Sequence, residues 1–211
     1  MACEFINIEA IKTASVTPEP FPYTIVNNSL VHHHLEKIHK DYPQIKDAGS
    51  FPLSTVQYGK HFEQLMDELK GDEFRSALAE KFELELHDKP VMITVRGKAD
   101  RKDGRIHTDS KSKLITVLLY MNEDWQPNGG RLRLLHNNHD LTNYFAEVSP
   151  SAGTMLIFKV TENGWHGHKT FIGTRKVIQL NYVTTETALS KHAKRHRISA
   201  KFKEWRRKIF G

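Results

Sequence analysis

The side chains of this sequence with the clearest capacity for chemistry are a few histidines, one carboxylate and one arginine. His107 and Asp109 stand two residues apart, His166 and His168 follow within Trp-His-Gly-His, and Arg175 comes shortly after them. Two imidazoles and one carboxylate leave open positions on an octahedral metal, and the usual occupant of such a site is non-haem Fe(II). These residues therefore favour an enzyme that activates oxygen at a metal.

A His-X-Asp pair alone is not specific, because the chain holds 13 histidines and a second such pair, His39 and Asp41. His39 lies in a predicted helix, in which residues i and i+2 point to different faces. His107 begins a predicted β region, in which residues i and i+2 share a face and can bind one ion. By itself, the pair at His107 and Asp109 is explained equally well by a turn histidine and a solvated acid.

The elements that must position these residues change in character at Pro90. Before it, after an irregular segment over residues 1–22, apolar residues recur at helical spacing over residues 31–42, 62–69 and 74–82. Closely spaced strands without intervening helices follow it, which indicates an antiparallel double-sheet jelly roll behind an N-terminal helical layer. The strands are predicted from segments rich in β-branched and aromatic residues, at 91–96, 114–121, 131–135, 144–148, 154–160 and 177–183.

The predicted fold class is therefore α+β: a double-stranded β-helix, or jelly roll, with an N-terminal helical layer and a C-terminal basic amphipathic helix. A length of 211 residues is enough to bury one hydrophobic core. Within one structural domain we expect an N-terminal extension with supporting helices (1–89), a catalytic jelly-roll core (90–184) and a basic C-terminal helix (185–211).

Arg175 opens the last predicted strand, so its side chain shares a face with those of Val177, Gln179 and Asn181. If this face points into the jelly roll, a guanidinium group lies in a mostly apolar interior, where an unpaired cation is very costly. No acidic residue of the sequence shares the inward pattern, so we expect a diffusible dicarboxylate to pair with the arginine. Tyr120, on an earlier strand, is placed to add a hydroxyl group to the same carboxylate.

In this order the residues resemble a known family, the iron(II)- and 2-oxoglutarate-dependent dioxygenases, and within it the prolyl 4-hydroxylase-like branch. The ordered combination is far more specific than any single piece. It covers about residues 90–184 and comprises His-Thr-Asp at 107–109, Leu-Leu-Tyr-Met-Asn-Glu-Asp-Trp at 118–125, Gly-Gly-Arg-Leu-Arg-Leu at 129–134, Pro-Ser-Ala-Gly-Thr-Met-Leu-Ile-Phe at 150–158, Trp-His-Gly-His at 165–168 and residues 175–181.

The resemblance implies a set of ligands, a set of cofactors and a reaction. His107, Asp109 and His166 would ligate Fe(II) and form the catalytic centre. Arg175, with help from Tyr120, would hold the distal carboxylate of 2-oxoglutarate, and O2 would be the oxidant, with ascorbate as a candidate reductant. The expected reaction is the hydroxylation of an unactivated C–H bond of an unidentified substrate, with release of succinate and CO2.

Two neighbouring positions compete with this assignment or depart from the family pattern. On a strand His166 and His168 share a face, but the family pattern and the step of nine residues to Arg175 favour His166 as the ligand. His168 is then expected beside the ligands, where it could orient one of them. The family often has a hydroxyl residue four positions after the arginine, where this chain has Gln179, and this difference alters a secondary contact to the co-substrate.

A rival hypothesis is a binding module, namely a jelly roll with a structural metal that uses its basic tail on a membrane or a nucleic acid. The tail is the source of the net charge of +6, because Lys191–Gly211 holds nine lysines and arginines against one acid. Its apolar stripe fits docking on the body of the protein, binding to an anionic membrane surface, or contact with nucleic-acid phosphates. The stripe consists of Ile198, Phe202, Trp205 and Ile209. The intact ligand set with its arginine favours the enzyme.

Basic residues also crowd the loop that leads into His107, namely Arg96, Lys98, Arg101, Lys102 and Arg105. Such a loop is often only solvated charge. Its alternative role is a positive rim that steers an anionic substrate, such as a phosphorylated sugar, a nucleotide, an acidic peptide or a lipid head group.

The composition is that of an ordinary soluble protein, with 38% hydrophobic and 27% charged residues. No apolar run approaches the ~20 residues that a membrane helix needs, and the first residues lack the basic and apolar regions of a signal peptide. Cys3 is the only cysteine. An intramolecular disulfide and a thiolate zinc site are therefore excluded, and a reducing, cytoplasmic location is expected.

Overall fold

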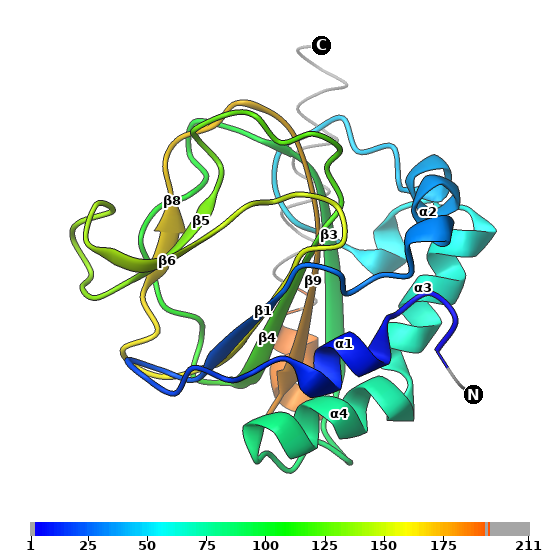
Figure 1. The fold of residues 1–211 in the computed structure, drawn as a ribbon, viewed down its shortest axis with the longest axis horizontal. Helices are drawn as coiled ribbons and strands as arrows, with labels where there is room; N and C mark the ends of the chain where they lie inside the picture. The colour runs from blue at the N-terminus through cyan, green and yellow to red at the C-terminus, as the bar shows by residue number, and fades with distance from the viewer. Residues whose placement is uncertain (1–2, 193, 195–211) are drawn as a thin grey trace.

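The structure of the chain is a computed structural model that describes residues 3–192 and 194 (Figure 1). Two β-sheets face each other, and a layer of helices covers the outer face of the larger sheet. The helices are α1 (Ile8–Thr13), α2 (Leu35–Asp41), α3 (Lys60–Lys70) and α4 (Asp72–Phe82), with short 3-10 turns η1 (His32–His34) and η2 (Leu53–Thr55). The strands are β1 (Tyr23–Val26), β2 (Phe51–Pro52), β3 (Val91–Ala99), β4 (Lys113–Tyr120), β5 (Leu132–Leu135), β6 (Tyr144–Val148), β7 (Met155–Lys159), β8 (His166–His168) and β9 (Gly173–Val183).

The two sheets have the arrangement expected of a jelly roll. The larger sheet has the strand order β1-β7-β4-β9-β3-β2, and the smaller sheet has the order β6-β5-β8. Every pairing between these strands is antiparallel. β4 and β9 lie side by side in the larger sheet, and β8 belongs to the smaller sheet, which faces it. Residues of these three strands, which are distant in the sequence, therefore meet between the sheets. The predicted mixture of helices with an antiparallel jelly roll is confirmed.

The helical layer is held on the larger sheet by apolar side chains. Phe62 and Leu65 of α3 and Leu78 of α4 are fully buried, and they belong to the same hydrophobic core as Val117 of β4 and Leu180 of β9. Burial of a large apolar side chain contributes roughly 1.5–3 kcal/mol, so this face fixes the curvature and position of the two strands that carry much of the site. The predicted helices over residues 62–69 and 74–82 are confirmed.

The N-terminal part differs from the prediction in its regular structure. An irregular segment is predicted over residues 1–22, but α1 lies within it, and the Asn7 side chain caps this helix by accepting a hydrogen bond from the backbone of Ala10. Three short strands also escape prediction, namely β1, β2 and β8, which have four, two and three residues. The two residues of β2 and the three of β8 are too few to show an alternating pattern.

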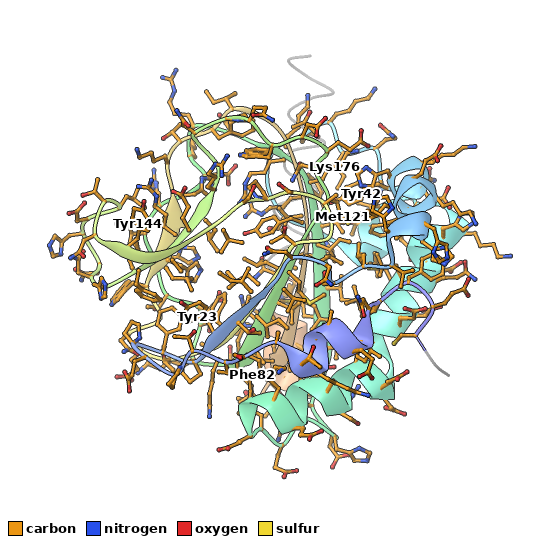
Figure 2. All side chains as sticks on the ribbon, viewed as in Figure 1. Tyr23, Tyr42, Phe82, Met121, Tyr144 and Lys176 are labelled. Atoms are coloured by element: carbon orange, nitrogen blue, oxygen red, sulfur yellow. The ribbon has the colours of Figure 1, made fainter. Side chains whose placement is uncertain are left out.

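A second apolar core fills part of the space between the sheets, as the side chains in Figure 2 show. It joins Phe158 of β7 and Val177 of β9 in the larger sheet to Leu132 and Leu134 of β5 in the smaller one. Tyr120 is fully buried in the same core. The rest of the intersheet space is lined mainly by polar and charged side chains and forms the candidate site.

Among the described residues, no helix combines the length and the apolar character that crossing a bilayer requires. Residues 186–192 are helical. Residue 194 is helical too. Residues 193 and 195–211 of the predicted basic helix, which include its stripe of Ile198, Phe202, Trp205 and Ile209, lie outside the described residues.

Candidate active site

His107 and His166 are brought together by direct backbone pairing. The two residues form an isolated antiparallel bridge, in which each N–H donates to the carbonyl of the other at 3.0 and 2.9 Å. Their rings lie with centroids 4.3 Å apart. Asp109 completes the group, since one possible ligand atom from each of the three side chains lies within 4.8 Å of the others. The residues predicted as metal ligands therefore converge on one point.

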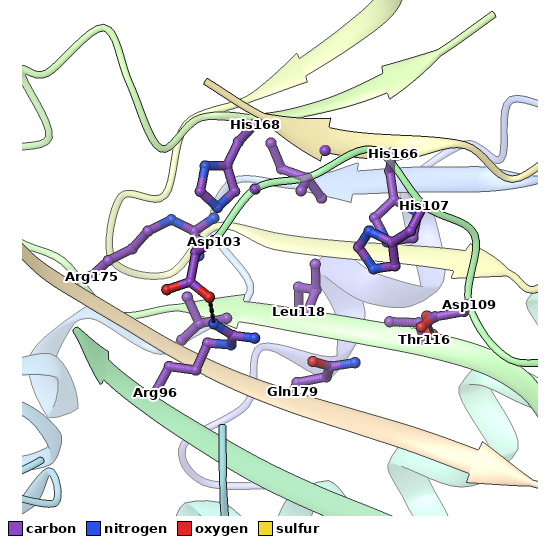
Figure 3. A pocket seen from close by; sticks show the side chains of 14 residues that line it. Arg96, Asp103, His107, Asp109, Thr116, Leu118, His166, His168, Arg175 and Gln179 are labelled. Carbon is purple, nitrogen blue, oxygen red and sulfur yellow. Dashed lines mark hydrogen bonds and ion pairs between the residues drawn. The ribbon is translucent and has the colours of Figure 1, made fainter. Parts of the chain in front are cut away.

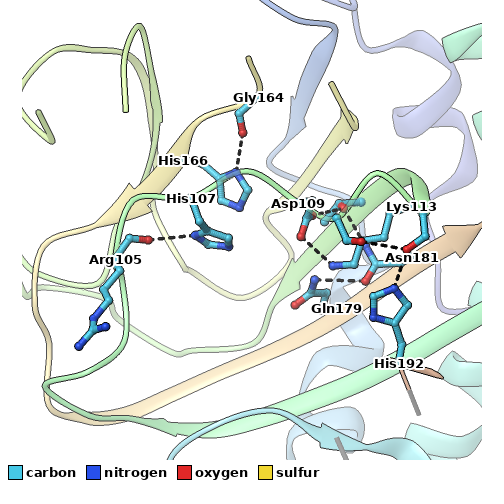
Figure 4. Close-up of polar contacts among 12 residues, drawn as sticks. Arg105, His107, Asp109, Lys113, Gly164, His166, Gln179, Asn181 and His192 are labelled. Atoms are coloured by element: carbon cyan, nitrogen blue, oxygen red, sulfur yellow. Dashed lines mark hydrogen bonds and ion pairs between the residues drawn. The ribbon is translucent and has the colours of Figure 1, made fainter. Parts of the chain in front are cut away.

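The hydrogen bonds of the two histidines fix which ring nitrogen is available to a metal (Figure 4). Nδ1 of His107 donates to the carbonyl of Arg105, and Nδ1 of His166 donates to the carbonyl of Gly164, both at 2.9 Å. A carbonyl can only accept, so in the neutral ring Nε2 carries the lone pair in both residues. Burial also lowers the pKa of His166 to about 4, so this ring is neutral at pH 7.

Asp109 is held by a donor on each of its carboxylate oxygens. Oδ1 accepts from Lys113 Nζ at 2.7 Å, and Oδ2 accepts from Thr116 Oγ1 at 2.5 Å. Burial alone would raise the pKa of Asp109, but the charge of Lys113 and these two hydrogen bonds outweigh it and hold the pKa below its usual value. Two imidazoles that each present Nε2 and one carboxylate fit a divalent metal such as Fe(II).

The pocket that contains this group extends between the sheets to a second charged region (Figure 3). Arg175 lies there and is only 6% exposed. Its Nε donates to the carbonyl of Gly130 at 2.9 Å, and its burial lowers the pKa of the guanidinium. Val177 and Gln179, two and four residues further along β9, also line the pocket, so the predicted inward face of this strand is confirmed.

One expectation about this region is wrong. The sequence predicts that no acidic residue shares the inward pattern with Arg175 and that a diffusible dicarboxylate is its partner, but the carboxylate of Asp103 also lines the pocket and pairs with Arg96 at 3.0 Å. Asp103 comes from the loop after β3, so a pattern based on alternating strand residues could not find it. Because Asp103 is engaged by Arg96, Arg175 has no ion-pair partner among the described residues.

Tyr120 lies behind Arg175 instead of inside the pocket. The guanidinium carbon of Arg175 is 5.5 Å from the centre of the Tyr120 ring. The tyrosine is fully buried, and its hydroxyl lies close to the Arg175 guanidinium without a well-formed hydrogen bond to any described residue. Burial raises the pKa of this hydroxyl, although the charge of Arg175 opposes the shift. The residue is thus adjacent to the predicted carboxylate site with an unused donor.

Gly129 and Gly130, which stand just before β5, lie at the Arg175 end of the pocket, and their contacts there explain why both positions are glycine. Gly130 has a φ of 76°, in the left-handed region that glycine adopts most easily. A Cβ atom added there would lie 2.7 Å from the ring of Trp125, and one added at Gly129 would lie 2.4 Å from the carbonyl oxygen of Thr170. Glycine at both positions therefore lets the backbone approach closely enough for Gly130 to accept from Arg175.

His168 lies at the end of the pocket near Arg175 and not among the three converging side chains (Figure 3). Its Nδ1 donates to the carbonyl of Lys169 at 2.9 Å. Burial, and after it the charge of Arg175, lowers the pKa of His168 to about 4. The geometry thus separates the two histidines of β8, with His166 beside His107 and His168 beside the guanidinium.

The rival pair in α2 does not converge. His39 Nδ1 contacts Glu123 at 2.5 Å, whereas Asp41 contacts His61 Nδ1 at 2.6 Å. Each member therefore has a different partner, as expected for residues i and i+2 of a helix.

The basic loop before His107 divides into two parts. Arg96 turns into the pocket and pairs with Asp103. Arg101, Lys102 and Arg105 are exposed. His107, which lines the pocket, is also exposed, so the exposed cations lie on the chain segment that leads to an open side of the site.

Residues 91–183 match the sequence model of one family, described as the 2OG-Fe(II) oxygenase superfamily. No curated protein has a significantly similar sequence. The matched segment runs from the start of β3 to the end of β9 and contains the whole candidate site. Over this segment the match confirms the predicted likeness to the superfamily, and together with the converging His107, Asp109 and His166 it supports the predicted cofactors Fe(II), 2-oxoglutarate and O2.

Solved structures agree with this match in fold. A Pseudomonas putida prolyl-4-hydroxylase superposes with a TM-score of 0.54 at 18% sequence identity, over 84% of this chain and 97% of that chain. A viral collagen prolyl hydroxylase from Paramecium Bursaria Chlorella virus-1, solved as a 2OG complex, gives a TM-score of 0.53 at 12% identity, over 77% of this chain and 96% of that chain. The fold is therefore prolyl 4-hydroxylase-like.

Proposed function

We propose that this chain is a 2-oxoglutarate-dependent dioxygenase that hydroxylates an unactivated C–H bond. Its residues 91–183, which match the model of the 2OG-Fe(II) oxygenase superfamily, support this proposal. In the overall reaction one oxygen atom of O2 enters the substrate as a hydroxyl group, and the other enters succinate as 2-oxoglutarate loses CO2. One observation supports this proposal most. A set of three donor residues lies in the same pocket as Arg175, which forms no ion pair with any residue that the structure describes.

At the metal end, Nε2 of His107, Nε2 of His166 and one oxygen of Asp109 would hold Fe(II). The bound iron would supply the activation of O2, a reaction that no side chain can carry out by itself. The contribution of the protein is geometric, because three ligands leave coordination positions open for the co-substrate and oxygen. The carbonyls that accept from the two histidines keep their rings oriented.

At the other end, Arg175 would bind the distal carboxylate of 2-oxoglutarate with its terminal nitrogens, since its Nε is already used by Gly130. A bidentate contact of this kind fixes the orientation of a carboxylate. Tyr120 would back the guanidinium and offer its free hydroxyl to the same group. The chain would thus hold the keto acid by both ends.

The apolar part of the pocket wall consists of Leu118, Leu132 and Val177. These side chains would limit the water that reaches the reacting groups, and a drier site strengthens every charged contact within it. This role complements that of the charged residues, which orient the co-substrate.

For the substrate we propose an anionic molecule. Arg101, Lys102 and Arg105 are exposed on the segment that leads to His107, which is itself exposed. Clustered cations beside a cleft raise the local concentration of anions and their rate of association. Prolyl specificity has no comparable support from the side chains of the pocket.

The reaction is tested by incubating the purified protein with Fe(II), 2-oxoglutarate and a set of substrate candidates, and by measuring succinate. We expect His107→Ala, Asp109→Ala and His166→Ala each to abolish substrate-stimulated succinate formation, because each change removes a proposed ligand. Full activity in any one of these variants would remove that residue from the ligand set.

A further inference from the structure

We propose that Lys113 is a positioning residue that couples the binding of the metal to the binding of 2-oxoglutarate. Its ammonium group would place a positive charge beside the metal, which disfavours binding of the bare metal ion and favours binding of the anionic co-substrate once the metal is bound. This inference rests on the proposed function and adds a role for a residue outside the ligand set.

The contact that carries the proposal is the ion pair between Lys113 and Asp109. Lys113 Nζ lies 2.7 Å from Asp109 Oδ1, and the two side chains are only 10% and 8% exposed. An ion pair shielded from water in this way is screened by salt much less than one on the surface. The position of the charge is also fixed, because Lys113 is the first residue of β4 and its N–H donates to the carbonyl of Ser110 at 2.9 Å.

The second oxygen of Asp109 is tied to the centre of the larger sheet (Figure 4). Thr116 Oγ1 donates to Asp109 Oδ2 and accepts from Asn181 Nδ2 at 2.7 Å, and Asn181 Oδ1 accepts from Gln179 Nε2 at 3.2 Å. Thr116 and Asn181 are direct neighbours in the β4–β9 pairing. The carboxylate is thus held directly by two residues of β4 and, through Thr116, by Asn181 of β9, and Lys113 supplies the charged contact in this network.

The charges of the pocket determine whether Lys113 should strengthen or weaken the binding of the metal and of 2-oxoglutarate. Lys113 neutralises Asp109, so the ligand set with its lysine is close to neutral before a metal binds, and a divalent ion leaves it with a net charge near +2. The other charged side chains that line the pocket, Arg96, Asp103 and Arg175, lie toward its opposite end (Figure 3). An anionic group that binds at the metal therefore meets two local sources of positive charge, the ion and Lys113.

The test replaces Lys113 by methionine, which keeps most of the length of the side chain and removes its charge. Binding of Mn(II), which does not support turnover, is measured by calorimetry, followed by binding of 2-oxoglutarate to the Mn(II)-loaded protein. We expect Lys113→Met to bind Mn(II) roughly tenfold tighter and 2-oxoglutarate roughly tenfold weaker. Lys113→Arg, which keeps the charge, should stay close to the wild type in both measurements.

A matched control comes from Lys111, which is two residues away and is paired with Glu162 at the surface. Its side chain is 85% exposed, so Lys111→Met removes the same charge where solvent screens it, and both affinities should remain unchanged. Circular dichroism and thermal denaturation show whether each variant is folded before titration.

The opposite signs of the two effects distinguish the proposal from a purely structural role. If Lys113→Met weakens both ligands, the lysine only maintains the shape of the site, and the proposal is overturned. Unchanged affinities would overturn it as well. If the wild-type protein binds neither Mn(II) nor 2-oxoglutarate, it is the proposed function that fails.

Discussion

The two histidines that converge with Asp109 present the same ring nitrogen to the pocket for the same reason. Each donates Nδ1–H to a carbonyl of its own segment, two residues earlier in the chain. His166 and His107 then differ mainly in exposure, since His166 is buried and His107 is exposed. His107 therefore lies at the exposed side of the pocket and His166 at its buried side.

The distinction between His166 and His168 gives the first prediction. His166→Ala should lose Mn(II) binding, whereas His168→Ala should keep it, because only His166 lies within ligand distance of the other two donors. His168 lies near Arg175, so its loss should affect 2-oxoglutarate more than the metal. Calorimetric titration of both variants checks this. The reverse result, with metal binding lost in His168→Ala alone, would show that the ligand assignment is wrong.

The arginine at the opposite end gives the second prediction. Arg175→Met should weaken 2-oxoglutarate binding to the Mn(II)-loaded protein by about 100-fold, which corresponds to the loss of a charge-assisted bidentate contact of about 3 kcal/mol. Binding of Mn(II) itself should be unchanged, and this serves as the internal control. A variant that binds 2-oxoglutarate as tightly as the wild type would place the co-substrate elsewhere.

At the scale of single residues, the sequence was informative about side chains that lie on strands and obey an alternating pattern. Arg175 and Gln179 face the pocket as predicted. Asp103 was missed because it lies on a loop, where no periodicity reports the direction of a side chain. Lys113 was missed because its role depends on a contact with Asp109 across a turn. The sequence does not give the shape of this turn, so it does not predict the contact.

At the scale of elements, the site depends on two neighbouring strands of the larger sheet and a short strand of the smaller one. β4 and β9 provide Thr116, Arg175 and Gln179, and β8 provides His166. The helical layer packs on the outer face of β4 and β9. It therefore supports the site mechanically without contributing a residue to the pocket lining.

The attachment of the N-terminal segment to this layer gives the third prediction. One carboxylate, Glu68 of α3, accepts hydrogen bonds from the backbone N–H groups of Glu4, Phe5 and Ile6 at 2.7–3.0 Å. Glu68→Ala leaves these donors unpaired and should lower the free energy of unfolding by about 2 kcal/mol. Chemical denaturation measures the change. Glu63→Ala, an exposed position of the same helix, is the control and should have little effect; equal stability of the two variants would contradict this account.

The helices and the longer strands could be predicted because amphipathic spacing and β-branched runs are properties of the local sequence. The short strand β8 could not, because its three residues are ordered by pairing with β5 and not by their own pattern. Prediction of the third ligand therefore relied on the likeness of the Trp-His-Gly-His segment to a family. The strand that carries His166 was not itself predicted.

At the scale of the whole molecule, the chain is a jelly roll with a pocket between its sheets and a cationic segment that leads to the site. The distribution of charge gives the fourth prediction, namely that anionic substrates are preferred. In matched pairs such as a phosphorylated sugar and the free sugar, the anionic member should stimulate succinate formation more, and the stimulation should fall as salt rises. The combined change of Arg101, Lys102 and Arg105 to alanine should flatten this salt dependence.

Two results would show that the exposed cations are only solvated charge. Succinate formation could respond only to the neutral members of the pairs, or the triple variant could keep the salt dependence of the wild type.

The rival hypothesis of a binding module makes a different prediction for the whole molecule. It requires a metal in the site but no use for 2-oxoglutarate, and it gives the ion-pair-free Arg175 no role.

The central claim is that one pocket holds Fe(II) by three side chains and 2-oxoglutarate by Arg175. It is tested most directly by adding Fe(II) and 2-oxoglutarate to the protein without oxygen and recording the weak visible absorption band of the iron–2-oxoglutarate chelate. We expect the band in the wild type, its loss in His166→Ala, and its recovery in Arg175→Met only at much higher 2-oxoglutarate. A folded wild-type protein that shows no band at saturating Fe(II) and 2-oxoglutarate would contradict the account.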